Sequence, residues 1–288
     1  MSGPLRLLLL TDGKPGHAAQ LRGLAEAVGR RTDVEVRWHD VADGGRADFA
    51  ADWVVGAGRR THWQLLTGSR RRGARSVVLM NPSLPRWLFD VCVVPRHDGV
   101  RGGNVVETVG VLNDVTADNV GDRRGGVVLI GGPSKHHGWD ADDLFASLND
   151  VLRSSREESW RITSSRRTPD ATLTRLHRRF AGDRRVRYIP HTQTPTGWVR
   201  EQLSQCRAAV VTEDSVSMLT EAMTAGCRTV ALPVPRRREG RVTRFVDDCL
   251  REGRLVRSAS ESVVTRPLWE ADRVAGLLLE RFVARRAA

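Results

Sequence analysis

Short apolar runs alternate with longer amphipathic stretches along most of the chain. The short runs are typical of buried strands, and the stretches between them repeat apolar residues at the spacing of one helix face. In the first half, this pattern predicts strands at 5–10, 34–38, 53–56, 76–80 and 91–94 and helices at 16–30 and 60–72. In the second half, it predicts strands at 127–130, 160–163, 186–189, 208–211 and 229–232 and helices at 140–153, 172–180, 198–205, 216–225 and 242–252.

Strands that alternate with helices at this spacing indicate βαβ units, and hence parallel sheets with helices on both faces. A polar, glycine-containing segment at 110–126 interrupts the pattern, which then restarts with a strand, a glycine-rich loop and a helix. We interpret this segment as a linker. The sequence therefore predicts an α/β protein with two Rossmann-like domains, at 1–122 and 123–265.

The last segment, 266–288, predicts a long helix that begins near Pro267. We expect this helix to pack across the two domains, and a basic helix on a membrane surface is the alternative. The apolar residues on one side of the helix are Leu268, Val274, Leu277, Leu278 and Phe282.

The chain carries 46 basic and 34 acidic residues, which gives a net charge of +12. This excess favours anionic partners, although a GC-rich genome also enriches arginine. Nucleic acid is not expected, because no aromatic–basic binding motif is present. Only two of the basic residues are lysines, Lys14 and Lys135, and each lies in a loop after an apolar run. Lysine is a compact point charge, so both positions are candidates for phosphate contacts.

The cellular compartment is inferred from three features that the sequence lacks: a cysteine framework, a signal peptide and a membrane-spanning stretch. Its four cysteines lie far apart, without metal-ligand or disulfide-framework spacing, and the N-terminal apolar run is too short for a signal peptide. No stretch reaches the length of a membrane-spanning helix. We expect a cytoplasmic protein, and the basic surface would suit a peripheral position on the anionic inner face of the cell membrane.

Ligands of open parallel sheets bind beyond the carboxyl ends of the strands, where this chain concentrates its polar loops. In the first domain, "DGKPGH" places Asp12, Lys14 and His17 within one loop. A histidine beside a carboxylate can act as a general base near neutral pH. A purely structural histidine is the competing interpretation.

Two loops of the second domain offer groups that bind phosphate. "TEDSVSMLTEAMTAG" begins with Asp214 or Ser215 as the N-cap of a helix, whose first amides form an anion site, and Glu221 lies within that helix. "TSSRRTPD" adds hydroxyl and guanidinium groups at a strand end. The same patterns are consistent with ordinary helix starts and a solvent-facing Glu221.

Several other chemistries are disfavoured. Neither glycine-rich loop matches the GxxxxGK[ST] phosphate loop, and the GxGxxG dinucleotide motif is absent. The pairs His136–His137 and His97–Asp98 lack a third ligand at metal-binding spacing, so no metal is expected.

Six segments in order resemble the mitochondrial fission protein family, whose plant founder is named for elongated mitochondria and whose bacterial members are regarded as glycosyltransferases. They read "LTDGKPGHAAQLRGLAEAVG", "GAGRRTHWQLL", "VVLMNPSLPRWLFDVCVVPRHDG", "LIGGPSKHHGWD", "TSSRRTP" and "VTEDSVSMLTEAMTAGC". The family is similar in turn to GT-B glycosyltransferases, so the resemblance implies two Rossmann-like domains that face a cleft.

The resemblance also implies roles for residues. Gly16–His17 matches a Gly-His pair of lipid-linked peptidoglycan transferases, which implies that His17 is the catalytic base. In that group three residues separate the ribose-binding glutamate from a glycine, whereas four separate Glu221 from Gly226. The implied catalytic residues are Asp12, Lys14 and His17, and the implied nucleotide-sugar-binding residues are Gly131, Gly132, Ser134, Lys135, Ser165, Arg166, Arg167, Asp214, Ser215, Val216, Ser217, Met218 and Glu221.

The function expected from this resemblance is transfer of a sugar from a nucleoside diphosphate donor to an envelope glycolipid or a similar acceptor. The nucleotide-sugar is a substrate, and no cofactor or metal is implied, because a helix dipole and basic side chains stabilise the leaving diphosphate. Two alternatives remain. One is a nucleotide-sugar epimerase on the same fold, and the other is a non-catalytic adaptor of the type described for the plant member.

Overall fold

A computed structural model of the chain describes residues 3–45, 49–117, 123–261 and 266–283. These residues divide into two compact units, one made of Met1–Asp114 with Trp269–Ala288 and the other of Val115–Leu268. Residues 118–122 and 262–265, where the predicted domain limits fall, lie outside the described residues, as does the predicted helical end at 284–288.

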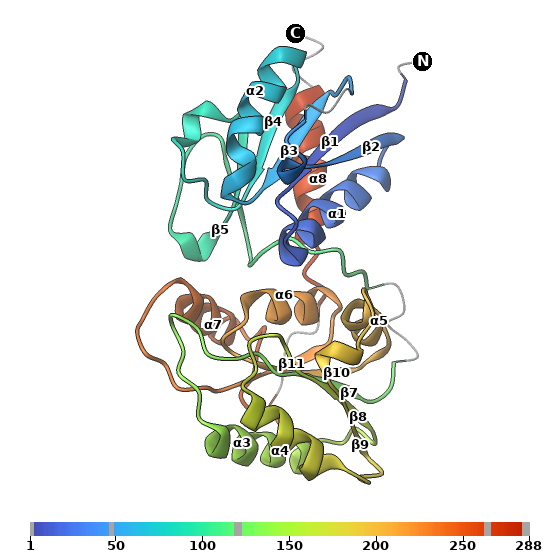
Figure 1. The fold of residues 1–288 in the computed structure, drawn as a ribbon, viewed down its shortest axis with the longest axis vertical. Helices are drawn as coiled ribbons and strands as arrows, with labels where there is room; N and C mark the ends of the chain where they lie inside the picture. The colour runs from blue at the N-terminus through green and yellow to red at the C-terminus, as the bar shows by residue number, and fades with distance from the viewer. Residues whose placement is uncertain (1–2, 46–48, 118–122, 262–265, 284–288) are drawn as a thin grey trace. The chain divides into compact units, whose positions relative to one another are not determined.

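The first unit contains a parallel sheet with the strand order β2-β1-β3-β4-β5-β6 (Figure 1). Its strands are β1 (Leu5–Thr11), β2 (Val34–Asp40), β3 (Trp53–Ala57), β4 (Arg75–Leu79), β5 (Val91–Pro95) and β6 (Val105–Thr108). Its helices are α1 (Pro15–Gly29), α2 (His62–Arg72) and α8 (Glu270–Val283), with 3-10 turns η1 (Val41–Asp43), η2 (Arg59–Thr61), η3 (Arg86–Leu88) and η4 (Arg96–Asp98).

The leucine run of β1 shows why this sheet is covered on both faces. Successive side chains of a strand point to opposite faces. Leu7 and Leu9 therefore pack in a core with residues of α1 and α8, whereas Leu8 and Leu10 pack in a second core with residues of α2. A strand that is buried on both faces must be apolar at every position, which explains the uninterrupted run.

Helix α8 belongs to the first unit, although it follows the second unit in the sequence. Val274, Ala275 and Leu278 are fully buried in the core beside α1. Arg30, the C-cap of α1, and the next residue, Arg31, donate to Asp272 at 2.8–3.1 Å. These contacts lie within the first unit, where the apolar side of the helix completes the core. The expected packing of this segment across both domains stays a prediction.

The second unit contains a parallel sheet with the strand order β11-β10-β7-β8-β9. Helices α3 and α4 cover one face, and α5, α6 and α7 lie on the other (Figure 1). Its strands are β7 (Gly126–Leu129), β8 (Trp160–Thr163), β9 (Val186–Ile189), β10 (Ala208–Thr212) and β11 (Arg228–Leu232). Its helices are α3 (Ala141–Ser154), α4 (Asp170–Phe180), α5 (Trp198–Gln205), α6 (Val216–Thr224) and α7 (Arg241–Arg251), with the 3-10 turn η5 (His191–Gln193).

The predicted fold class is confirmed, because each unit is a Rossmann-like α/β layer structure with an all-parallel sheet. The predicted strands and the helices before α8 begin and end within one or two residues of the observed ones. Strand β6 was not predicted: it is a short edge strand whose first three residues are partly or fully exposed, so it has no continuous apolar run.

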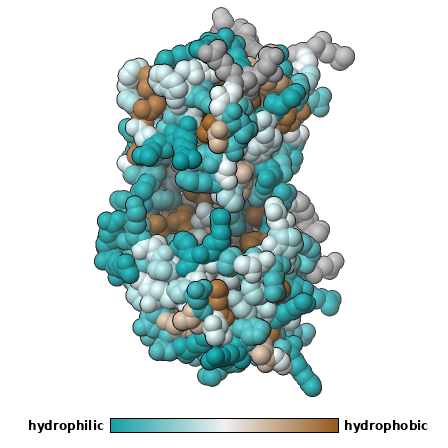
Figure 2. Space-filling model, viewed as in Figure 1, coloured by the Kyte–Doolittle hydropathy of each residue, from teal (hydrophilic) through white to brown (hydrophobic). Residues whose placement is uncertain are grey.

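The face in Figure 2 is largely hydrophilic, with apolar residues scattered over it. Among the described residues, no helix combines the length and the apolar composition needed to cross a membrane.

Candidate functional site

The carboxyl ends of β1 and β3 form a polar site in the first unit. From β1 the chain passes to β2 on one side and later to β3 on the other, so a topological switch point lies between β1 and β3. Ligands of doubly wound sheets bind at such points, because the loops on either side diverge there. Asp12 follows β1 directly, and His17 lies in the first turn of α1.

Asp12 and His17 form a short hydrogen bond, with 2.7 Å between Asp12 Oδ1 and His17 Nδ1. The Asp12 side chain is 1% exposed and the His17 side chain 16% exposed. A carboxylate that accepts from Nδ1 holds the proton on that nitrogen and leaves Nε2 as the basic nitrogen. The pair therefore has the arrangement of an oriented general base.

Two further features shape this pair. Lys14 Nζ lies 3.6 Å from the second carboxylate oxygen, Asp12 Oδ2, and its side chain is 68% exposed. Gly58, just after β3, adopts φ +95° and faces the pair: a Cβ on this residue would lie 2.5 Å from His17 Nδ1. Only glycine satisfies both the backbone conformation and the close approach.

The charges around Asp12 favour its ionised form. Burial alone would raise its pKa, but the hydrogen bond to His17 and the charges of His17 and Lys14 outweigh burial and lower the pKa below its usual value. Asp12 is therefore a carboxylate at neutral pH and can stabilise a positive charge that develops on His17.

In the second unit the switch point lies between β7 and β10, and the loops after these two strands interlock. Gly131 N donates to Thr212 Oγ1 at 2.8 Å, and Gly132 N donates to Asp214 Oδ2 at 3.1 Å. A Cβ on Gly131 would lie 2.3 Å from Asp214, so the approach requires glycine. Gly131 therefore lets the first loop lie directly against the second, and Gly132 likewise lets it approach the backbone of Arg167, in the loop after β8.

Arg167, in the loop after β8, stabilises the contact between the loops after β7 and β10. Its guanidinium donates to Asp214 Oδ2 at 2.7 Å and to Gly132 O at 2.7 Å. The Asp214 side chain is fully buried, so this ion pair orders the loop that leads into α6. Arg167 and Asp214 are thus engaged with each other and with the backbone, and their predicted contact with a nucleotide-sugar stays a prediction.

Helix α6 begins at this switch point. Ser215 is the N-cap, because its Oγ accepts from Met218 N at 3.4 Å, which resolves the alternative between Asp214 and Ser215. The first amides of a helix have no acceptor within the helix and carry a partial positive charge. The predicted binding residues of this helix, all of them partly exposed, are Val216, Ser217, Met218 and Glu221.

The remaining predicted residues lie in the loops after β7 and β8. Ser134 Oγ accepts from His136 N and His137 N, at 3.2 and 3.1 Å, so it shapes the first of these loops. Ser165 N donates to Thr168 Oγ1 at 2.9 Å. The side chains of Lys135 and Arg166 are exposed at the surface.

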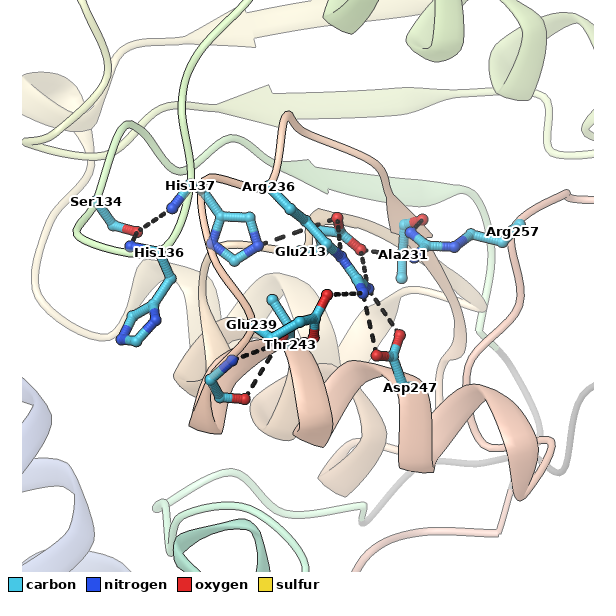
Figure 3. Close-up of polar contacts among 11 residues, drawn as sticks. Ser134, His136, His137, Glu213, Ala231, Arg236, Glu239, Thr243, Asp247 and Arg257 are labelled. Carbon is cyan, nitrogen blue, oxygen red and sulfur yellow. Dashed lines mark hydrogen bonds and ion pairs between the residues drawn. The ribbon is translucent and has the colours of Figure 1, made fainter.

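A buried carboxylate, Glu213, was missed by the sequence analysis. It lies between β10 and Asp214, and its side chain is 2% exposed. Figure 3 shows this carboxylate beside Arg236 and His137. Arg236 donates to both carboxylate oxygens at 3.3 Å, and Arg257 donates to Oε2 at 2.6 Å. In the sequence, the indication that Glu213 could belong to a site is its position directly after an apolar strand.

The cluster extends from Glu213 to α7 and to the loop after β7. Arg236 also donates to both oxygens of Asp247 in α7, at 3.0 and 2.7 Å. His137 is fully buried, with Nε2 4.0 Å from Glu213 Oε1. Burial is the main cause that lowers the pKa of His137, which favours the neutral imidazole. This network joins the loops after β7, β10 and β11, and so supports the residues before α6.

No group of three or more potential metal ligands occurs among the residues that the structure describes.

The two parallel sheets with their flanking helices give the chain a two-unit α/β architecture with a GT-B-like fold. The chain belongs to the mitochondrial fission ELM1 family, whose model matches residues 15–282. An uncharacterized protein of Rickettsia prowazekii is 22% identical over 280 residues, which cover 79% of this chain and 78% of that protein.

Solved structures with the same fold have low sequence identity. A Listeria monocytogenes protein assigned as a UDP-N-acetylglucosamine 2-epimerase is 10% identical, with a TM-score of 0.61 and coverage of 98% of both chains. The UDP-GlcNAc 2-epimerase of Neisseria meningitidis bound to UDP-GlcNAc is also 10% identical, with a TM-score of 0.56, and the match covers 96% of this chain and all of that one. At such identity, the likeness shows the fold alone.

Proposed function

We propose that this protein transfers a sugar from a nucleoside diphosphate donor to a hydroxyl of an acceptor. The observation that carries the proposal is the 2.7 Å hydrogen bond between buried Asp12 and His17 at a switch point. A general base must be oriented with one nitrogen directed to take a proton, and a carboxylate bonded to Nδ1 orients the ring with Nε2 as the basic nitrogen. The fold, which is shared with UDP-GlcNAc 2-epimerases, supports a nucleotide-sugar as the donor.

The donor would bind in the second unit, at the start of α6. The amides of Val216 and Ser217 can donate to the diphosphate, because a helix has no acceptor of its own for them. Glu221, one turn or more into the helix, can accept from the ribose hydroxyls. Lys135 and Arg166 are exposed cations on the neighbouring loops and would neutralise the leaving diphosphate.

The reaction can be written with these groups alone. His17 Nε2 accepts the proton of the acceptor hydroxyl, and Asp12 stabilises the imidazolium. The acceptor oxygen forms a bond to the anomeric carbon of the sugar while the bond from that carbon to the diphosphate oxygen breaks. The electron pair leaves with the nucleoside diphosphate, which the helix dipole and the basic side chains stabilise.

The proposed acceptor is an envelope glycolipid at an anionic membrane surface. The net charge of +12 supports attraction to such a surface, because each basic residue near an anionic leaflet adds to the binding energy. A peripheral position on the inner face of the cell membrane would bring the enzyme to this acceptor.

Nucleotide binding is the first test of the proposal. A ligand that binds the native state alone raises the melting temperature. We expect one of UDP, GDP, CMP, ADP or dTDP to raise it both with and without EDTA, and Ser217→Ala to reduce the shift. A chain whose melting temperature responds to none of them would instead fit the adaptor alternative.

Sugar-nucleotide epimerisation is the second candidate, and the observation that favours it is the fold shared with UDP-GlcNAc 2-epimerases over nearly the whole chain. Incubation with the donor in the absence of acceptor separates the two reactions. A new sugar epimer would identify the epimerase, whereas slow hydrolysis without an epimer would fit the transferase. His17→Ala should abolish transfer in the presence of acceptor while nucleotide binding persists.

A further inference from the structure

In the connection between β2 and β3, the described residues contain no α-helix, although a doubly wound fold usually places one there. The chain leaves β2 at the edge of the sheet, crosses β1 and returns as β3. Within the described part of this connection, the regular structure is the 3-10 turn η1. Because α1 and α8 lie on the other face, α2 is the helix that packs against this side of β1, and the described part of the connection adds no α-helix beside it.

A pocket of about 560 Å³ lies at this place, between α2 and the connection. Its apolar lining includes Leu8 and Leu10 of β1, Phe49 of the connection and Trp63 of α2. Side chains along α2 from Trp63 to Arg72 line one wall, which corresponds to a length of roughly 14 Å. The volume lies within the range of small-molecule sites, and the shape favours an elongated ligand.

The polar groups of the pocket favour an anion. Its described lining includes Arg71, Arg72 and His39 and no carboxylate. Arg72 is engaged with carbonyl oxygens, donating to Phe49 O at 2.8 Å and to Gly68 O at 3.0 Å. Arg71, by contrast, forms no ion pair with any residue that the structure describes.

His39 and Trp63 also line this pocket. The Nε2 atom of His39 is buried and has no hydrogen-bond partner among the described residues. Because this atom is closed off from solvent, it is not counted as a contact point for a ligand. Trp63, 73% exposed, lies about two helical turns from Arg71 and extends the apolar wall toward solvent.

We propose that this pocket is a binding site for an amphiphilic anion, meaning a linear apolar chain with a single phosphate or carboxylate group. The apolar chain would lie along Phe49 and Trp63, and the anionic group would pair with Arg71. The site lies wholly in the first unit and shares no residue with the proposed nucleotide site of the second unit. Binding there can therefore be measured independently of sugar transfer.

The test uses the full chain and decyl phosphate below its micelle concentration, with binding followed by isothermal titration calorimetry. We expect saturable binding of one molecule per chain. Arg71→Gln should weaken it about tenfold, because it removes a charge-assisted hydrogen bond. Arg70→Gln is the matched control, since Arg70 is the exposed neighbour on the same helix and does not line the pocket.

Gly68→Leu tests the pocket by filling its space instead of removing a charge. Gly68 lies within α2 on the pocket wall, and the nearest atom to a Cβ there is the flexible end of Arg72, at 3.4 Å. Leucine favours a helix more than glycine does, so the variant should remain folded while its side chain fills the space. Decyl phosphate binding should then be lost, with the melting temperature unchanged or raised.

Two further ligands identify what the site recognises. Decyl maltoside carries the same chain without charge, and inorganic phosphate carries the charge without a chain; each should bind at least tenfold more weakly than decyl phosphate. The proposal would be overturned by absence of saturable decyl phosphate binding, by equal affinity for either comparison ligand, or by Arg70→Gln weakening binding as much as Arg71→Gln. Unaltered binding to Gly68→Leu would overturn it as well.

Discussion

Replacement of Glu213 by glutamine tests whether its buried charge supports the second unit. Glutamine keeps the size of the side chain but removes the charge that faces Arg236 and Arg257. Removing one partner of a buried ion pair costs about 3–5 kcal/mol. Arg236 retains Asp247, and its side chain is 27% exposed, so hydration offsets part of this cost. We expect the free energy of unfolding to fall by about 2–3 kcal/mol.

The assay must report on the second unit, because two units need not unfold together. Hydrogen exchange of peptides from β7 and β10, followed by mass spectrometry at increasing urea concentrations, measures opening of this sheet directly. Asp142→Asn is the matched control in the same unit. Asp142 is 89% exposed and pairs with Arg175 at the surface, so its loss should cost at most about 1 kcal/mol.

The pH dependence distinguishes loss of charge from a packing defect. Burial by itself would raise the pKa of Glu213, but the hydrogen bonds and charges of Arg236 and Arg257 outweigh burial and lower it. A carboxyl group with a lowered pKa stabilises the folded state above its unfolded pKa, and this contribution is lost as pH falls through the folded pKa. The difference between wild type and Glu213→Gln should therefore be largest near pH 7 and shrink under acid conditions. A difference that stays constant down to the acid transition would refute the electrostatic explanation.

Three other changes test the first unit. Gly58→Ala should disturb the Asp12–His17 pair, because a Cβ there lies 2.5 Å from His17 Nδ1 at φ +95°; loss of the histidine's native imidazole NMR signals in the folded variant checks this. Asp12→Asn should lower kcat about 100-fold or more with little change in nucleotide affinity, if His17 is the base that Asp12 orients; unchanged kcat would rule out that role. Leu278→Ala should lower the free energy of unfolding of the first unit by about 2–5 kcal/mol, since Leu278 is fully buried, and urea unfolding with hydrogen exchange of β1 measures it.

The elements and the fold class follow from short-range patterns in the chain. The run of four leucines in β1 predicts a strand covered on both faces, and the structure places alternate leucines in separate cores. The loop "DGKPGH" brings Asp12 and His17 close because a turn and the first helical turn separate them, so their hydrogen bond follows from nearby residues.

Contacts between distant segments were decided by the tertiary structure alone. The order of strands in each sheet determines that Gly58 faces Asp12 and His17, and that the loop of Gly132 meets Asp214. The expectation that Lys14 and Lys135 each contact phosphate stays a prediction of the sequence.

Glu213 and α8 are two further cases in which the sequence alone does not identify the contact partner. A glutamate is normally exposed, and only Arg236 and Arg257, brought from after β11, make its burial tolerable. The apolar side of α8 is evident from the sequence, but its partner is not: the helix is far from α1 along the chain and completes the first core. Local periodicity reports which side of an element is apolar, whereas the surface that it covers depends on chain topology and on the free energy of burying both surfaces together.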